Sequence, residues 1–323
     1  MKFLTINGKL QRNANGQFIT VPDNYDNELL TLNGKLLKTS AGLIGNKYRP
    51  AKEDTNYITF TGESSDFTLK AKNKEWDGTV EYSTDRNTWT EWDGSEISSS
   101  GKKLYLRGSG NTTFRTKRGA QFVLSARAAC SGNIQTLLEY SNPPTTLAND
   151  CYRDMFNGCT SLTVAPELPA TTLTPGCYQN MFYRCTNLVQ APELPATTLA
   201  IRCYQSMFNG CTNLTTAPEL PATTLADNCY QSMFNGCTSL TAAPELPATT
   251  LASYCYQSMF NGCTSLKIST TQSSEYPTAW RIPSSGTIPS KASNWNISML
   301  KGTGGTFTSN PNRNTTYYGA WTK

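Results

Sequence analysis

Apolar residues recur with a fixed period of 26 residues through the middle of the chain. The copies begin at Cys151, Cys177, Cys203, Cys229 and Cys255. A period in this range is typical of a solenoid, in which each repeat buries its apolar face only against its neighbours. We therefore expect about five stacked repeats with a broad polar exterior. Such an architecture suits a binding surface better than an enclosed catalytic pocket.

The first half of each repeat predicts two turns of helix. In the third repeat, four apolar residues have the spacing of one helical face: Tyr204, Met207, Phe208 and Cys211. Asn209-Gly210 tolerates positive φ and would end such a helix. Asp150, Asn228 and Ser253 stand just before the first cysteine of their repeats, where an N-cap residue would lie.

The second half of each repeat predicts an extended segment, which in the third repeat runs from Leu214 to Leu220 with both leucines pointing inward. Pro218 and Pro221 donate no backbone hydrogen bond, so the strand must be short. The fold class that we expect is therefore mainly β with short helical turns, arranged as a solenoid over residues 128–268.

Three other segments flank the repeats. Residues 53–127 predict a small β-sandwich-like domain, because apolar and polar residues alternate at 58–60, 67–69 and 103–108. Trp76, Trp89 and Trp92 of this domain could stack on sugars, but we favour core packing. Residues 269–323 leave the repeat and predict a β-rich C-terminal cap over the last repeat.

Residues 1–52 predict an N-terminal attachment arm with hairpins. Asn-Gly stands between alternating apolar residues at 7–8 and again at 33–34, which is a strong hairpin signal. So short a segment buries little core by itself. We expect the arm to become ordered on a partner or on copies of itself, and the protein to be a homo-oligomer.

Composition and charge exclude several classes of partner. The chain of 323 residues is 37% hydrophobic and 16% charged, against about 25% charged in an average globular protein. Residues 143–268 carry four basic and seven acidic residues, a balance of −3. We therefore expect no nucleic-acid partner. No apolar run is long enough to span a membrane.

The chain contains no histidine. This absence removes Ser-His-Asp and Cys-His catalysis, His-ligated metals and any histidine-based pH switch. We expect no enzymatic activity, no cofactor and no metal site.

Ten of the eleven cysteines form two columns at the first and ninth positions of the repeats. Within a repeat the two cysteines would lie about 12 Å apart on a helix, beyond the roughly 7 Å limit for a disulfide. Disulfides between neighbouring repeats and a metal site remain alternatives. We favour reduced thiols that pack as small apolar side chains.

The stretch Met-Phe-Asn-Gly-Cys-Thr-Ser-Leu, at 155–162, 233–240 and 259–266, is followed by Pro-x-Leu-Pro in the first two of these copies. This pattern resembles the leucine-rich repeats of the BspA-like bacterial surface proteins, over roughly residues 130–268. The resemblance implies a leucine-rich-repeat solenoid and a role in adhesion at a surface. Members of that family usually carry a secretion signal, and the opening residues 1–8 are too short and too soon interrupted to be one.

Two sets of exposed positions are candidates for contact with a ligand. The pair before each first cysteine differs from copy to copy, and it supplies Asp150, Arg202, Asp227, Asn228 and Tyr254. This variation is either drift in a tolerant loop or a graded recognition surface. A second column contains Glu167, Glu193, Glu219 and Glu245, which we expect to be solvated rather than to bind Ca²⁺.

We favour a non-enzymatic adhesion or receptor-binding protein of a phage virion, a fibre or decoration protein. Its arm, which loosely resembles the attachment segments of phage fibres, would contact virion proteins, and the solenoid would contact host-surface glycan or protein. The alternative is a BspA-like adhesin of the bacterial cell surface. A third class, a glycosidase that uses paired carboxylates of the Glu column, is disfavoured because nothing in the sequence would raise one pKa above the other.

Overall fold

The computed structural model describes residues 56–115, 119, 121–280, 294–312, 316–319 and 321–322, together with eight two-residue strands between residues 2 and 43. The chain divides into an N-terminal part, residues 1–55, and a main part, residues 56–323. The described residues are mainly β, in several sheets of which none closes into a barrel. Their one helical element is the short 3-10 helix η1 (Ile134–Leu137).

The N-terminal part confirms both predicted hairpins. Strands β2 (Thr5–Ile6) and β3 (Lys9–Leu10) pair antiparallel, with Ile6 opposite Lys9. Strands β5 (Thr31–Leu32) and β6 (Lys35–Leu36) repeat this arrangement around positions 33–34. Two further antiparallel pairs complete the described strands of this part: β1 (Lys2–Phe3) with β4 (Thr20–Val21), and β7 (Lys38–Thr39) with β8 (Gly42–Leu43).

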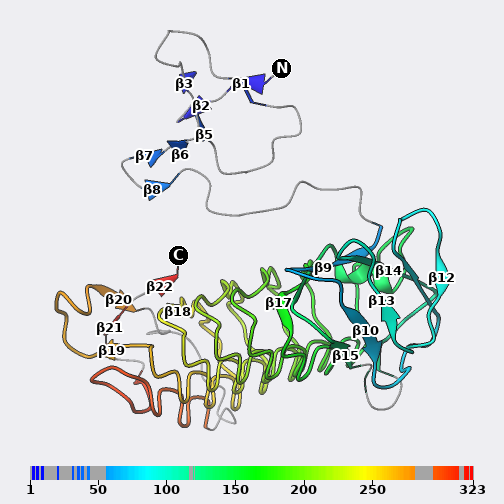
Figure 1. Ribbon diagram of the computed structural model, residues 1–323. Coiled ribbons are helices and arrows are strands. Elements are labelled where there is room, and N and C mark those ends of the chain that lie inside the picture. The colour runs from blue at the N-terminus through cyan, green and yellow to red at the C-terminus, as the bar shows by residue number, and fades with distance from the viewer. Residues whose placement is uncertain are drawn as a thin grey trace. The chain divides into compact units, whose positions relative to one another are not determined.

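The main part begins with two facing sheets (Figure 1). The larger has six strands in the order β12 (Thr90–Glu91), β11 (Thr79–Ser83), β14 (Lys103–Ser109), β9 (Ile58–Gly62), β16 (Ala128–Ser131) and β17 (Leu162–Val164). The smaller has the order β13 (Ile97–Ser98), β10 (Thr68–Ala71) and β15 (Phe122–Leu124). The predicted strands at 58–60 and 103–108 are therefore confirmed, and most of the one at 67–69.

The sheets and the repeats share one hydrophobic core. Strand β17 belongs to the first repeat, and it pairs parallel with β16. The Phe114 ring stacks on the Tyr152 ring of the first repeat at 6.1 Å, and the Phe122 ring meets the Phe156 ring edge to face at 5.6 Å. The sequence predicts a small β domain over residues 53–127, and the described residues of this range pack directly against the first repeat.

The predicted helical turns are wrong. Between residues 150 and 159, the N–H groups of the odd-numbered residues donate to the carbonyl three residues back, as from Met155 to Tyr152 at 3.2 Å. Those of the even-numbered residues donate to the next repeat, as from Phe156 to Met181 at 2.9 Å. All ten N–H groups are satisfied in this way. We call this arrangement the turn ladder; it returns at 176–185, 202–211 and 228–237, and at 255–263 in the fifth repeat.

Positive φ at every fourth residue prevents a helix here. In the first repeat these residues are Asp150, Asp154 and Gly158, with φ of 55°, 62° and 73°. The equivalent positions of the other repeats also have positive φ. Each such residue interrupts the run of right-handed φ values that a helix needs. Its own N–H donates to the neighbouring repeat, as from Asp154 to Gln179 at 3.0 Å, and the next N–H donates three residues back, as from Met155 to Tyr152. The expected N-cap residues Asp150 and Asn228 are therefore turn residues.

Apolar side chains of successive repeats stack in columns inside the turn ladder. The tyrosine rings from Tyr152 to Tyr256 lie 5.8–5.9 Å apart and nearly parallel. The phenylalanine rings from Phe156 to Phe260 lie 5.5–5.7 Å apart. Each stacked pair contributes about 0.5–1.5 kcal/mol beyond the burial of its apolar area. Figure 1 shows the corresponding segments as successive loops of chain side by side.

The extended half of the repeats adds only single parallel bridges. They link Val164 to Gln190, Gln190 to Thr216 and Thr216 to Ala242. Prolines two and five residues beyond Thr216 limit the extended segment, as predicted. Both leucines that bound the segment are buried, Leu214 at 0% and Leu220 at 3% exposure.

Part of the predicted C-terminal cap continues the turn ladder. Residues 294–303 receive hydrogen bonds from the fifth repeat, as from Phe260 N–H to the Met299 carbonyl at 3.0 Å. Asn294, Ser298 and Gly302 repeat the positive φ of the ladder. The remaining strands are β18 (Ala243–Pro244) in the fourth repeat, β19 (Ile268–Ser269) at the end of the fifth, and β20 (Thr278–Trp280), β21 (Tyr317–Gly319) and β22 (Trp321–Thr322) beyond it. Strand β21 pairs with β19 and β20, and β22 pairs parallel with β18.

The substitution Ser232→Gly distinguishes the turn ladder from a helix. Ser232 has φ of 54°, so glycine should relieve backbone strain and raise the free energy of unfolding by about 0.5–1 kcal/mol. In a helix, the same substitution would lower it by about 0.5 kcal/mol. Ser239→Gly is the control, because Ser239 lies in the same repeat and has no positive φ. Chemical denaturation measures both, and a loss of stability in Ser232→Gly would refute the ladder.

Candidate functional site

The variable pairs form a continuous row on the surface, which we call the variable edge. It consists of residues 149–150, 175–176, 201–202, 227–228 and 253–254. The backbone N–H of Asp150 donates to the Pro175 carbonyl at 2.8 Å, and that of Arg202 donates to the Asp227 carbonyl at 3.1 Å. Equivalent bonds join the other pairs. The structure thus brings together five predicted site residues that lie up to 104 positions apart (254 − 150) in the sequence.

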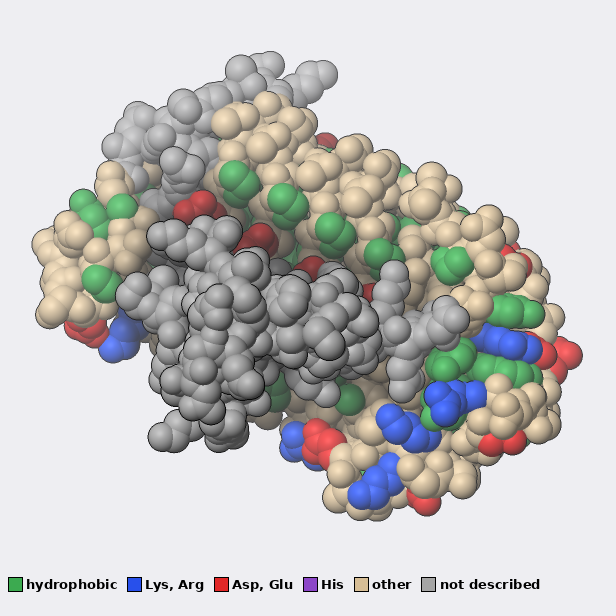
Figure 2. Space-filling view, turned by 90° about the horizontal axis from the view of Figure 1, so that it is seen from above, with side chains coloured by type: hydrophobic (Ala, Val, Ile, Leu, Met, Phe, Trp, Pro, Cys, Tyr) green, Lys and Arg blue, Asp and Glu red, His purple; other side chains and the backbone are tan. Residues whose placement is uncertain are grey.

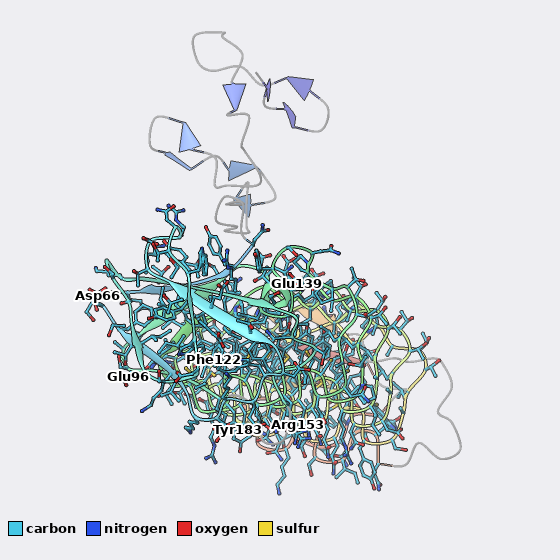
Figure 3. The ribbon with its side chains drawn as sticks, turned by 90° about the vertical axis from the view of Figure 1, so that its right-hand side faces the viewer. Asp66, Glu96, Phe122, Glu139, Arg153 and Tyr183 are labelled. Carbon is cyan, nitrogen blue, oxygen red and sulfur yellow. The ribbon has the colours of Figure 1, made fainter. Side chains whose placement is uncertain are left out.

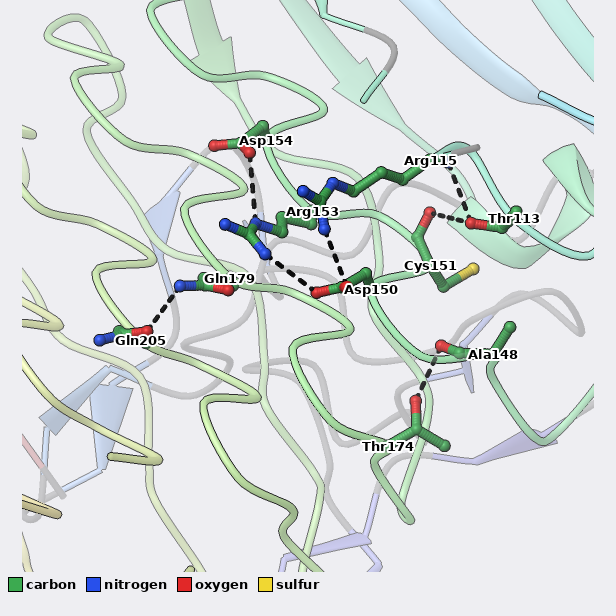
Figure 4. Close-up of polar contacts among 10 residues, drawn as sticks. All are labelled: Thr113, Arg115, Ala148, Asp150, Cys151, Arg153, Asp154, Thr174, Gln179 and Gln205. Atoms are coloured by element: carbon green, nitrogen blue, oxygen red, sulfur yellow. Dashed lines mark hydrogen bonds and ion pairs between the residues drawn. The ribbon is translucent and has the colours of Figure 1, made fainter. Parts of the chain in front are cut away.

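The two aspartates of the variable edge, on the first and fourth repeats, have different surroundings. The carboxylate of Asp150 is half-buried and pairs with Arg115 at 2.8 Å and with Arg153 at 3.4 Å (Figure 4). The Asp227 carboxylate is exposed and accepts the Ser253 backbone N–H at 2.8 Å. Asp150 is therefore committed to an internal ion-pair network, whereas Asp227 faces solvent.

The other three predicted residues of the variable edge differ in exposure. Arg202 is exposed. Asn228 is half-buried, and its amide donates to the Gln231 side chain at 2.9 Å. Tyr254 is half-buried, and its hydroxyl accepts the Asn294 amide at 3.2 Å. The edge therefore offers a different charge and shape at each repeat on a constant backbone.

The backbone of the variable edge favours glycine at its second position. Asp150, Gly176, Arg202, Asn228 and Tyr254 all have φ between 55° and 64°. Aspartate and asparagine tolerate this conformation, but arginine and tyrosine are uncommon in it. Each bulky residue there costs about 1–2 kcal/mol relative to an unstrained backbone. Fold stability alone would favour glycine, as at Gly176.

A row of glutamine amides runs beside the variable edge. The Gln179 amide donates to the Gln205 side chain at 2.5 Å (Figure 4), Gln205 donates to Gln231, and Gln231 donates to Gln257. In the first repeat Arg153 takes the equivalent position. This row of amide hydrogen bonds fixes the spacing of the repeats next to the variable edge. The signal for this row is one glutamine at the same position of four repeats in the sequence.

The Glu column recurs at the same exposed position of four repeats: Glu167, Glu193, Glu219 and Glu245. Figure 2 shows a row of acidic side chains over the repeats. Among the residues that the structure describes, no group of three or more Cys, Asp or Glu side chains could hold a metal ion. The column is thus a line of carboxylates at the surface.

All eleven cysteines are free and buried. Burial raises the pKa of each thiol, to about 11 for Cys159 and about 12 for Cys177. Thiols of the second column donate to a carbonyl of the preceding repeat, as from Cys185 Sγ to Phe156 O at 3.0 Å. A protonated, inaccessible thiol is a poor nucleophile and a poor metal ligand. These cysteines therefore act as small core residues.

The three tryptophans of the sheet region divide between core and surface. Trp76 and Trp92 are 5% and 1% exposed and stack on each other at 5.3 Å. Trp89 is half-buried, with the guanidinium of Arg107 4.1 Å from its ring centre. Core packing thus accounts for two of the three rings and leaves Trp89 as a candidate for contact with a ligand.

No protein-family model, no curated protein and no solved structure matches this chain. In the part of the chain that the structure describes, no helix has the length and apolarity needed to cross a membrane. Any functional conclusion therefore depends on the geometry of the surfaces described above.

We expect native thiols to be unreactive and the fold to be sensitive to alkali. Each folded thiol has a raised pKa, so its contribution to stability is present below the unfolded thiol pKa of about 8.5 and is lost as the pH rises toward the folded value. Each thiol should lower the free energy of unfolding by about 1.4 kcal/mol per pH unit in that window.

Chemical denaturation at increasing pH and titration with a thiol-specific chromogenic disulfide reagent test this prediction. The native protein should show no fast-reacting thiol, and the denatured protein should show all eleven. Rapid labelling of the native protein would contradict the burial of the columns.

Proposed function

We propose that this protein is a non-enzymatic binding protein whose residues 128–268 form a leucine-rich-repeat-type solenoid of the BspA-like kind. Three observations support the solenoid. Repeats bond to each other through alternate N–H groups, their aromatic rings stack in two columns, and parallel bridges link their extended segments. Each repeat thus buries its apolar residues against its neighbours.

The observation that carries the binding role is the choice of residues on the variable edge. Arg202 and Tyr254 occupy positive-φ positions where glycine would be more stable. Backbone strain of this kind is retained where a side chain is needed for function. Arg202 is also exposed. We propose that the variable edge contacts host-surface glycan or protein.

We propose a phage virion fibre or decoration protein as the setting, with the N-terminal part attached to other virion proteins. The support is the separation of residues 1–55 from the main part and their series of short hairpins. A bacterial cell-surface adhesin is the alternative, which the resemblance of the repeats favours. Mass spectrometry of purified phage particles and of phage-free cell envelopes distinguishes the two settings.

Arg202→Gly should stabilise the protein and weaken its binding. Removal of the strained side chain should raise the free energy of unfolding by about 0.5–1 kcal/mol. Loss of an exposed arginine from a recognition surface should weaken binding about tenfold. The measurement is the adsorption of fluorescently labelled protein to intact cells from a panel of bacterial strains.

Ser232→Gly is the matched control, because it makes the same backbone change in the turn ladder away from the variable edge. It should leave adsorption unchanged. Undiminished adsorption of Arg202→Gly would show that the edge is a drifting loop rather than a recognition surface.

A further inference from the structure

The outer face of the six-stranded sheet carries a cluster of aromatic and arginine side chains. Along β14, Leu104 and Leu106 are fully buried in the core, whereas Tyr105 and Arg107 point to the opposite face because side chains alternate along a strand. Four residues from neighbouring segments join these two. We call the set the aromatic–arginine patch: Tyr57, Arg86, Trp89, Tyr105, Arg107 and Tyr140.

Arg107 holds the centre of the patch rigid. Its guanidinium lies between two rings, 4.1 Å from the centre of Trp89 and 4.3 Å from the centre of Tyr140. Its Nε donates to a carboxylate oxygen of Glu81 at 2.7 Å, and Glu81 is its register partner on β11. Cation–π contact with two rings and a charge-assisted hydrogen bond fix the guanidinium, and with it both rings.

The remaining rings extend the patch on the other side of Trp89. The Tyr57 ring lies 5.8 Å from Trp89 and 5.3 Å from Tyr105, edge to face with the latter. The indole N–H of Trp89 donates to the Arg86 carbonyl at 3.2 Å, which sets the orientation of its ring. Tyr57, Trp89 and Tyr140 are each half-buried. Contact with these rings would therefore cost little side-chain entropy.

The chemistry of the patch favours a carbohydrate over an apolar partner. Three of its rings carry a tyrosine hydroxyl group, and two guanidinium groups and the Glu81 carboxylate lie among the rings. The large hydrophobic side chains that are most exposed among the described residues lie elsewhere, at Val164, Val189 and Ile201. A lipid surface or an apolar protein partner would require a continuous apolar area. A pyranose ring matches the patch, because it has one flat C–H face and a rim of hydroxyl groups.

The charges near the patch offset each other. Arg107 pairs with Glu81, and Glu91 is the register partner of Glu81 on β12. A neutral sugar would add no uncompensated charge. We propose that the aromatic–arginine patch binds neutral hexose glycans, with sugar rings stacked on Trp89 and Tyr57 and hydroxyl groups bonded to the surrounding polar side chains.

This site goes beyond the proposed function, which assigns recognition to the variable edge of the repeats.

The test uses the full chain and neutral hexose oligosaccharides, first on a glycan array and then by isothermal titration. Trp89→Ala should weaken binding about tenfold, because it removes the central ring. Trp89→Tyr keeps a ring and should retain most of the affinity, so a loss caused by misfolding is recognised. Thermal melts of both variants check that the sheet is intact.

Tyr183→Ala is the matched control. Tyr183 is also half-buried beneath a guanidinium, that of Arg184 at 5.2 Å. Figure 3 shows Tyr183 near the bottom of the described residues and Glu139, which precedes Tyr140 in the chain, near the top. Its loss should leave glycan affinity unchanged.

Three outcomes would overturn the proposal: no neutral glycan bound by the intact chain, undiminished binding by Trp89→Ala, or binding that Arg202→Gly abolishes and Trp89→Ala does not affect. The last outcome would leave the proposed role of the variable edge in place. Conversely, loss of glycan binding in Trp89→Ala alone, with Arg202→Gly still adsorbing to cells, would support the patch and contradict the edge.

Discussion

Alternating backbone hydrogen bonds in the turn ladder are the constraint on which the main part depends. Because every second N–H is committed to the next repeat, the repeats must lie in register, and equivalent side chains must stack. The aromatic columns, the thiol columns and the glutamine amides all follow from that register. Apolar burial then adds stability to an arrangement that the backbone has already specified.

The same register determines the outer surface of the repeats. A side chain at any outward position recurs in every repeat, so identical residues yield the exposed carboxylates of the Glu column, and differing residues yield the variable edge. The sheets at the start of the main part are built on a different principle. There Arg107 links strands β14 and β11 and two rings from separate segments, which makes the aromatic–arginine patch a local assembly without periodicity.

Much of this organisation could be predicted from the sequence, and the failures have physical reasons. The period of 26 residues and the two Asn-Gly hairpins were evident, because repeated apolar residues and special turn residues are local signals. The helix prediction failed because Tyr152, Met155, Phe156 and Cys159 fit a repeat of four residues as well as one of 3.6 over so short a stretch. The missing information was the positive φ at Asp154 and at the equivalent positions of the other repeats. The asparagine or serine at those positions, such as Asn180 or Ser206, does not reveal it.

One of the two candidate sites could be predicted from the sequence, and the other could not. The variable edge was predictable because its members differ where the rest of the repeat is constant, and stacking places them together. The aromatic–arginine patch was not predictable from the sequence, since Trp89, Arg107 and Tyr140 come together only through strand pairing and through the segment that follows η1. No sequence signal separated Trp89 on the surface from Trp76 and Trp92 in the core.

Residues 294–303 show that a segment without the repeat sequence can extend the turn ladder. They join the ladder 40 positions after their counterparts in the fifth repeat (Gly302 after Gly262), with Trp295 and Leu300 in place of cysteine and phenylalanine. Backbone atoms make these hydrogen bonds, so whole repeats could be duplicated or deleted in the gene without loss of the turn ladder. A foreign segment could also be inserted between two repeats. Reach and shape could then evolve without redesign of the interior.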